Sequence, residues 1–177
     1  MKATGIVRRI DDLGRVVIPK EIRRTLKIRE SEPLEIFTDR NGEIILKKYS
    51  PMGEITTCAQ QIAQAASKTC GKLFVICDQD QIIAACGPDS KKFLGKPISQ
   101  TMEQLIFDID FFQESSVYYP VIEDDPYTDQ IILPVIASGD PIGAVFFLST
   151  KKNAPLGTTE KKIAEMAARF LGLSMET

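Results

Sequence analysis

The sequence IDDLGRVVIPKEIRRTL, residues 10–26, decides the fold of the first part of this chain. A turn is expected at 11–14, where aspartate side chains can bond to nearby backbone and a glycine can adopt positive φ. A short apolar strand is expected at 15–18, and Pro19 then stands where proline is tolerated, at the first position of a helix. That helix, residues 20–26, is only about two turns long. The stretch therefore predicts a turn, a strand and a very short helix.

Further strands are expected on both sides of this stretch. Residues 5–10 have the pattern of a strand that precedes the turn. Residues 34–38 and 43–47 have the pattern of two strands joined by Asn41-Gly42, the strongest short hairpin signal. The first part of the chain is therefore expected to consist of four short strands and one small helix.

Residues 1–50 are small and basic as a group. They hold twelve Lys and Arg against eight Asp and Glu, whereas residues 51–177 hold ten against sixteen. A domain of about 50 residues is marginal without disulfides, metals or oligomerisation, and no cysteine precedes Cys58. We therefore expect a paired, basic N-terminal domain on an acidic body, with residues 51–53 as the linker.

Residues 54–177 have the pattern of a separate α+β domain. Apolar and small residues recur every three or four positions at 54–69 and at 158–173, which predicts a helix at each end. Between these two helices the sequence predicts one further helix and five strands: a helix within 99–110, and strands at 73–77, 82–86, 116–122, 130–137 and 142–148.

The composition argues against several kinds of site. The chain has no histidine, the commonest general base and metal ligand, and its four cysteines form no Cys-x-x-Cys pair. We therefore expect no metal, no cofactor, no catalytic residues and no enzymatic activity. The sequence contains no 18-residue apolar run and no signal-peptide core, so we expect a cytoplasmic protein with reduced thiols and no membrane segment.

The N-terminal residues resemble the AbrB-type family of transition-state regulators, whose heads are built from swapped hairpins. The resemblance rests on segments that match the family motif almost position by position: residues 5–11, 13–19, 22–26, 34–36 and 44–49. It implies that two chains interleave their hairpins into one β-barrel-like head that binds double-stranded DNA. Ser31-Glu32 departs from the Gly-Asp common in the family, a change that bears on loop geometry.

The C-terminal domain resembles, more loosely, the GAF-like domains that some members of this family carry. The order of strands and helices and the segment Gly-Asp-Pro-Ile-Gly-Ala, residues 139–144, support this resemblance. Such members activate and repress transcription in the developing spore, and GAF domains act as small-molecule sensors and dimerisation units. The resemblance therefore implies a sequence-specific, nucleoid-associated regulator of sporulation genes that acts in the forespore.

Four arginines match the DNA-contacting positions of the family: Arg8, Arg15, Arg23 and Arg24. A guanidinium donates hydrogen bonds in a rigid fork that suits phosphates and guanine edges. The second-rank candidates are Arg9, Lys2, Lys20 and Lys27. Each side chain appears twice in a dimer, so binding should be steeply salt-dependent. The motif contains no long recognition helix, so specificity should come mainly from DNA shape.

Two further groups of residues suggest a functional role. Asp11 and Asp12 suggest a metal or catalytic pair, but turn formation explains them better. A pocket for an unknown small-molecule effector is expected between the sheet and the mid-chain helices, with four candidate lining residues: Cys77, Cys86, Phe107 and Phe111, with Phe112 beside them. Cys77 and Cys86 are equally well explained as small buried apolar residues.

The assembly and the function class each leave alternatives open. The helices at 54–69 and 158–173 either pack on their own sheet or pair between chains, which gives a dimer or, as we expect, a tetramer. One alternative function is an antitoxin-type DNA-binding module that partners a toxin, although such modules carry a disordered tail. Another is an enzyme that reduces small sulfoxides, which would need an exposed cysteine of low pKa.

Overall fold

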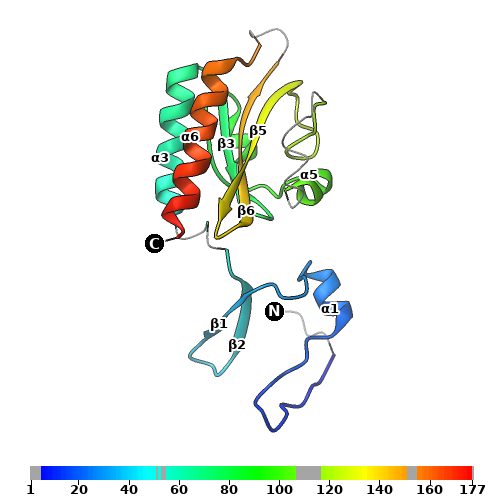
Figure 1. The fold of residues 1–177 in the computed structure, drawn as a ribbon. Helices are drawn as coiled ribbons and strands as arrows, with labels where there is room; N and C mark the ends of the chain where they lie inside the picture. The colour runs from blue at the N-terminus through cyan, green and yellow to red at the C-terminus, as the bar shows by residue number, and fades with distance from the viewer. Residues whose placement is uncertain (1–4, 51, 53–54, 107–116, 151–154, 177) are drawn as a thin grey trace. The chain divides into compact units, whose positions relative to one another are not determined.

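The computed structural model describes residues 5–50, 52, 55–106, 117–150 and 155–176 of the 177-residue chain. The chain divides into two compact units, Met1–Tyr49 and Ser50–Thr177, called the N-terminal and C-terminal units. Each unit has its own helices and its own sheet (Figure 1).

The N-terminal unit has three elements in chain order: α1 (Lys20–Thr25), β1 (Leu34–Thr38) and β2 (Ile44–Lys48). The two strands pair in antiparallel fashion and form a hairpin. Asp39 holds its turn, because Oδ1 accepts hydrogen bonds from the backbone N–H groups of Asn41 (2.9 Å) and Glu43 (2.9 Å). Gly42 has a φ of 79°, which glycine adopts without strain. The hairpin predicted from Asn-Gly is confirmed.

The two segments that flank the first turn do not form the expected strands. Residues 5–10 and 15–18 are not part of any sheet in the single chain. The turn between them is closed by backbone hydrogen bonds from Asp11 N to Arg15 O (3.1 Å) and from Gly14 N to Asp11 O (3.0 Å). A strand needs a neighbouring strand for its backbone groups, and in the described part of the chain β1 and β2 pair only with each other.

No side chain among residues 5–50 is buried. Apolar side chains that could form a core are open to solvent: Val7 is 87% exposed, Val17 72% and Ile44 70%. Burial of apolar surface is the main favourable contribution to folding, at roughly 25 cal/mol per Å². The N-terminal unit of one chain therefore lacks the hydrophobic core that a stable domain needs.

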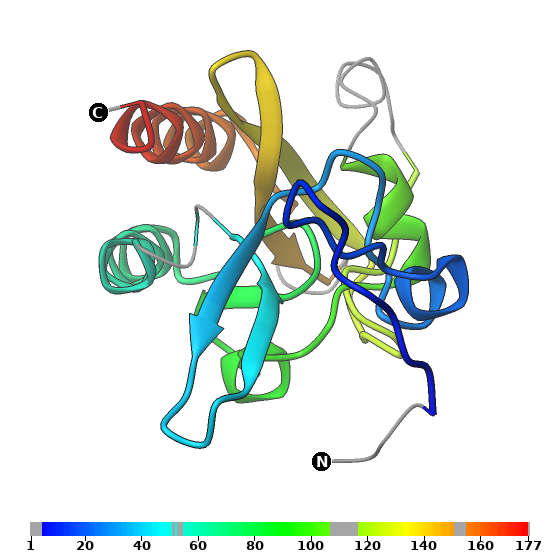
Figure 2. The ribbon, with the colours of Figure 1, turned by 90° about the horizontal axis from the view of Figure 1, so that it is seen from below.

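The C-terminal unit is a four-stranded antiparallel sheet with helices on both faces (Figures 1 and 2). Its elements are α3 (Thr56–Cys70), β3 (Leu73–Cys77), β4 (Ile82–Cys86), α4 (Ser90–Phe93), α5 (Gln100–Leu105), β5 (Asp129–Ala137), β6 (Asp140–Ser149) and α6 (Thr158–Ser174). The strand order is β4-β3-β6-β5. The long helices α3 and α6 lie side by side against one face, and α4 and α5 pack on the other.

Alternate side chains of β3 lie on opposite faces of this sheet. Phe74 and Ile76 belong to the core beneath α3 and α6, whereas Val75 and Cys77 belong to the core beneath α4 and α5. The Phe74 ring meets the Phe147 ring of β6 edge to face, with 4.6 Å between centroids. This unit, unlike the N-terminal one, contains its own extensive core.

The strand expected at 116–122 is not formed in the described part of that segment. Asp125 organises it instead, because its carboxylate accepts hydrogen bonds from Val121 N (2.7 Å), from Tyr127 N (3.1 Å) and from the Tyr118 hydroxyl. Bonds from backbone to a side chain compete with strand pairing. The described sheet of this unit therefore has four strands, one fewer than expected.

Candidate functional site

The basic side chains of the N-terminal unit lie around its first turn and along α1. Arg8 and Arg9 precede the turn and Arg15 follows it, and all three are exposed. Four more lie on α1 or just after it: Lys20, Arg24 and Lys27, which are exposed, and Arg23, which is half-buried. Lys2 lies outside the described residues. Seven of the eight candidate DNA contacts are thus placed on this one small unit.

Asp11 binds both the backbone and the side chain of Arg15. Its Oδ1 accepts hydrogen bonds from the backbone N–H groups of Leu13 (3.0 Å) and Arg15 (2.8 Å), and its Oδ2 accepts one from Arg15 Nε (2.8 Å). The backbone bond from Arg15, followed by its side-chain bond, lowers the pKa of Asp11. The carboxylate is therefore ionised at neutral pH, and the predicted role of Asp11 in the turn is confirmed.

A sharp turn ends α1 and places its arginines at the end of the helix. Lys27 adopts a φ of 53°, and the N–H of Ile28 donates to the carbonyl of Arg23 (2.7 Å). Arg23 Nη1 lies 3.7 Å from Glu30 Oε1, a loose and largely exposed ion pair. Arg24 forms no ion pair within the described residues. The guanidinium of Arg24 is thus open to an external anion.

Glu32 ties the loop after α1 to the hairpin. Its Oε2 accepts a hydrogen bond from the Arg29 backbone N–H (2.6 Å), and its Oε1 lies 3.3 Å from Lys48 Nζ on β2. Ser31 beside it has a φ of 63°, a left-handed conformation that costs a residue other than glycine about 1 kcal/mol. Serine in place of the family's glycine at this point therefore adds backbone strain to the loop.

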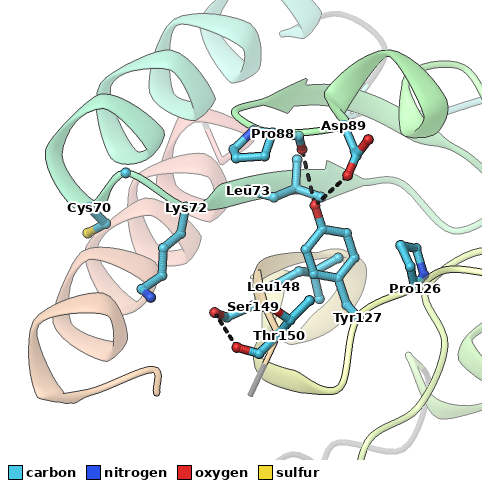
Figure 3. Close-up of a pocket in the computed structure, with 11 residues that line it drawn as sticks. Cys70, Lys72, Leu73, Pro88, Asp89, Pro126, Tyr127, Leu148, Ser149 and Thr150 are labelled. Carbon is cyan, nitrogen blue, oxygen red and sulfur yellow. Dashed lines mark hydrogen bonds between the residues drawn. The ribbon is translucent and has the colours of Figure 1, made fainter. Parts of the chain in front are cut away.

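The C-terminal unit has a pocket of about 480 Å³ at the end of its central strands (Figure 3). Lys72, Asp89 and Tyr127 line it, with Cys70 and Ser149 at its margin. The Tyr127 hydroxyl donates toward the carbonyl of Pro88 (3.2 Å) and the Asp89 carboxylate (3.5 Å). The pocket thus presents an amine, a carboxylate and a phenol. The sequence indicated only a strand end at Gly87-Pro88, so it gave no signal for this pocket.

The two cysteines expected to line one pocket lie on opposite faces of the sheet. Cys77 is fully buried beneath α4 and α5, whereas Cys86 packs against the core of the opposite face. Phe107 and Phe111, like Phe112, lie outside the described residues. Burial, followed by the charge of Asp78, raises the pKa of the Cys77 thiol. A buried thiol of raised pKa is a poor nucleophile.

Two further observations concern sites of other kinds. Within the described ranges, no group of three Cys, Asp or Glu side chains is close enough together to hold a metal ion. In the same part of the chain, no helix has the length and apolar character needed to cross a membrane.

We expect the stability of the C-terminal unit to fall at alkaline pH. Burial, followed by the Asp89 charge, raises the pKa of Tyr127 to about 12, and burial also raises that of Tyr118. The unfolded phenols ionise first, near pH 10, so the stability gained from keeping them neutral is complete below pH 10 and is lost as the pH rises above it. Urea unfolding at pH 9 and 11 measures this loss. Tyr127→Phe should reduce it, and an equal loss in that variant would contradict the assignment.

The chain therefore has two domains. The N-terminal unit is basic and has no core of its own, and the C-terminal unit is an α+β domain of the GAF type, with an antiparallel sheet between helices. The crystal structure of the PixJ GAF domain of Thermosynechococcus elongatus matches it with a TM-score of 0.54 at 8% identity, covering 73% of this chain and 89% of that chain. A likeness at this identity shows the fold alone.

Sequence comparison identifies the family. Residues 54–176 match the family model described as stage V sporulation protein T C-terminal, transcription factor. Stage V sporulation protein T of Bacillus subtilis (strain 168) is 50% identical over 179 residues, covering 99% of each chain. The chain belongs to the stage V sporulation protein T family of transcription factors.

The N-terminal residues have relatives of their own. Transition state regulatory protein AbrB of Bacillus subtilis (strain 168) is 65% identical over 51 residues, which are 29% of this chain and 52% of that protein. A solution structure titled as the N-terminal DNA recognition domain of AbrB matches at 65% identity, covering 29% of this chain and 94% of that chain with a TM-score of 0.26. Residues 7–54 also match a family model described as antidote-toxin recognition MazE, bacterial antitoxin.

Proposed function

We propose that this chain regulates transcription by binding specific sites on double-stranded DNA, through a head made from the N-terminal units of two chains. One observation carries the proposal: residues 5–50 combine a surplus of exposed basic side chains with the lack of any buried core among them. The 65% identity of this part to AbrB, whose N-terminal part is described as a DNA recognition domain, supports it.

Pairing of two chains would supply what the N-terminal unit of one chain lacks, namely strand partners and a buried core. Residues 5–10 and 15–18 are apolar at several positions and belong to no sheet, and the corresponding segments of a second chain would supply both a neighbouring strand and a cover for Val7 and Val17. A unit closed by a twofold axis carries every arginine twice. The interleaved barrel expected from the family resemblance satisfies both requirements.

The proposed DNA contacts are mainly to phosphates. Arg8, Arg15 and Arg24 are exposed, and guanidinium groups form charge-assisted bonds to phosphate oxygens. α1 has only six residues, too few to lie along the major groove as a recognition helix does. Readout of DNA shape, with a few base contacts by arginine, is the form of specificity that this unit supports.

An exposed apolar stripe on α6 supports association of C-terminal units. The spacing of a coiled-coil seam is followed by three exposed residues, Met166, Phe170 and Leu173, and by Ile163, which is partly buried against the unit's own core. Met166 is 58% exposed, Phe170 47% and Leu173 66%. Pairing along α6 would bury these exposed side chains. The α6 interface and the N-terminal interface give a dimer when both join the same two chains and, as we propose, a tetramer when they join different chains.

The C-terminal unit is proposed to act as a small-molecule sensor in the cytoplasm, and in the forespore in particular. The pocket at Lys72, Asp89 and Tyr127 supports this, because an amine, a carboxylate and a phenol suit a small polar effector. Activation at some promoters and repression at others follows from the resemblance stated above. The expectation that the chain is not an enzyme agrees with membership of a transcription factor family.

An antitoxin-type module is the second candidate function. The match of residues 7–54 to the bacterial antitoxin family model favours it. The body counts against it, because the described residues 55–176 build a sheet with two buried cores rather than a tail that folds on a partner.

Selection from a random duplex pool tests the proposed function. The full chain, incubated with the pool at physiological salt, is expected to enrich one family of sites over several rounds. Binding without enrichment would leave only non-specific association, and no binding at low salt would contradict a DNA-binding role. Stable complex formation between the DNA-binding chain and a separately expressed toxin would favour the antitoxin function.

A further inference from the structure

The carboxylate of Asp11 does more than close the first turn. Its Oδ1 alone satisfies the turn, by accepting the N–H groups of Leu13 and Arg15. Its Oδ2 is used separately, to hold Arg15 Nε at 2.8 Å. The second oxygen therefore acts on a side chain that is one of the main candidates for DNA contact.

The hairpin turn at Asp39 shows that capping by itself does not require this arrangement. Asp39 Oδ1 accepts the N–H groups two and four residues further on, those of Asn41 and Glu43, as Asp11 Oδ1 does. Its Oδ2 accepts the side-chain amide of Asn41 (3.1 Å), which is neutral. The same backbone cap thus occurs twice in this unit, and only the first holds a cation.

The bond to Nε decides which N–H groups of the Arg15 guanidinium remain available to bind a ligand. An arginine can present either its two terminal NH₂ groups or the pair formed by Nε and one NH₂ group. With Nε engaged, the two terminal NH₂ groups are left, and within the described residues the structure gives them no bond. Two parallel donors of this kind match the two oxygens of a phosphate or the O6 and N7 of a guanine.

We propose that Asp11 is a positioning residue that holds Arg15 for bidentate, end-on contact with DNA; this inference rests on the proposed function. An acceptor pair on the DNA, whether two phosphate oxygens or one guanine edge, is the expected partner. Holding a flexible side chain in its bound geometry before binding reduces the entropy lost on association. An acidic residue thereby strengthens the binding of an anionic ligand.

Simple electrostatics predicts the opposite effect, which makes the proposal testable. Removal of a carboxylate beside the DNA should, on charge alone, tighten binding. Asp12 is the matched control, because it is the neighbouring exposed carboxylate and forms no hydrogen bond within the described residues. Asp12→Asn removes the same charge without touching Arg15.

The variant Asp11→Asn separates the two roles of the carboxylate. The asparagine oxygen can still accept the N–H groups of Leu13 and Arg15, so the turn is kept. Its amide nitrogen replaces Oδ2 and donates, so it cannot accept the bond from Arg15 Nε. Fluorescence anisotropy with a selected duplex and a scrambled one is expected to show about tenfold weaker binding by this variant. Asp12→Asn should bind as tightly as the parent or slightly more tightly.

A double-mutant cycle with Arg15→Ala shows whether Asp11 acts through Arg15. In that background, Asp11→Asn should have no further effect on affinity, whereas a merely structural residue would weaken binding there as well. If Asp11→Asn loses affinity only for the selected duplex, Arg15 contacts a base edge. If it loses affinity equally for both duplexes, Arg15 contacts a phosphate. Unchanged or tighter binding by Asp11→Asn, or an undiminished effect in the Arg15→Ala background, would overturn the proposal.

Two further results complete the test. If Asp11→Asn does not fold, Arg15→Lys replaces it in the test. Lysine keeps the charge and the backbone bonds of the turn but lacks the two parallel NH₂ donors, so this variant should bind DNA about tenfold more weakly than the parent. Parent-like binding by Arg15→Lys would overturn the proposal. A parent chain that binds no DNA would refute the proposed function together with this inference. Parent binding with no loss in Asp11→Asn refutes the inference alone.

Discussion

Arg15→Ala is expected to weaken the binding of the full chain to duplex DNA by at least about a hundredfold at physiological salt. Each charge-assisted contact is worth roughly 1.5–3 kcal/mol, and a twofold head loses two of them. Because two phosphate or base contacts disappear, the salt dependence of the remaining binding should also be shallower. Fluorescence anisotropy titrations at several salt concentrations measure both quantities.

Arg40 provides the matched control for this substitution. It is an exposed arginine in the turn between β1 and β2, outside the segments that resemble the DNA-contacting positions. Arg40→Ala removes the same charge but should change the affinity by only about twofold, through the general field. Both variants should keep the parent's mass by light scattering. Arg15→Ala binding as tightly as Arg40→Ala would show that the assigned contact is wrong.

A fragment of residues 1–52 is expected to fold only as a dimer. In one chain no side chain among residues 5–50 is buried, so a folded monomer would leave much of its apolar surface exposed to solvent. Circular dichroism of the fragment should therefore show structure at high concentration and lose it on dilution. Sedimentation over the same range should show the dimer disappearing in parallel.

The fragment of residues 50–177 is the control, since its cores around Phe74 and Phe146 lie within one chain. Its circular dichroism should stay the same on dilution, even where its association changes. A fragment of residues 1–52 that is monomeric and still folded would remove the argument for interleaved chains.

Local signals predicted the local structures of this chain correctly. Asn41-Gly42 with flanking apolar strands gave the hairpin, because the turn chemistry and the strand pattern agree within 15 residues. Pro19 marked the start of α1 for a similar reason. Ser99 caps α5, through a bond that Met102 N donates to its Oγ (3.1 Å), within the stretch where a helix was expected.

Structures that depend on distant partners were not predictable in this way. The strands expected at 5–10 and 15–18 need a neighbour that the single chain does not place beside them. The segment before Asp125 has the composition of a strand, but one carboxylate captures its backbone and hydroxyl donors. The pocket at Tyr127 joins the ends of β3 and β6 with loops far apart in sequence, and periodicity carries no information about such a meeting.

The same distinction applies to the candidate DNA contacts: the sequence could nominate Arg15, but it could not predict the bond between Arg15 and Asp11. Residue type and resemblance suffice to nominate Arg15, because a guanidinium in a basic motif has an evident use. The bond from Arg15 Nε to Asp11 Oδ2 depends on side-chain geometry within the turn. An aspartate in a turn has an adequate explanation without it, so only the structure separates the roles of its two oxygens.

The most direct test of the central claim combines the mass of the full chain with its DNA affinity across a salt series. Light scattering should give the mass of two or four chains, and log affinity for duplex DNA should fall with log salt at a slope of about −4 or steeper, as expected when a paired arginine surface neutralises several phosphates. A monomeric mass, or an affinity that does not respond to salt, would contradict the claim that two chains form one cationic head.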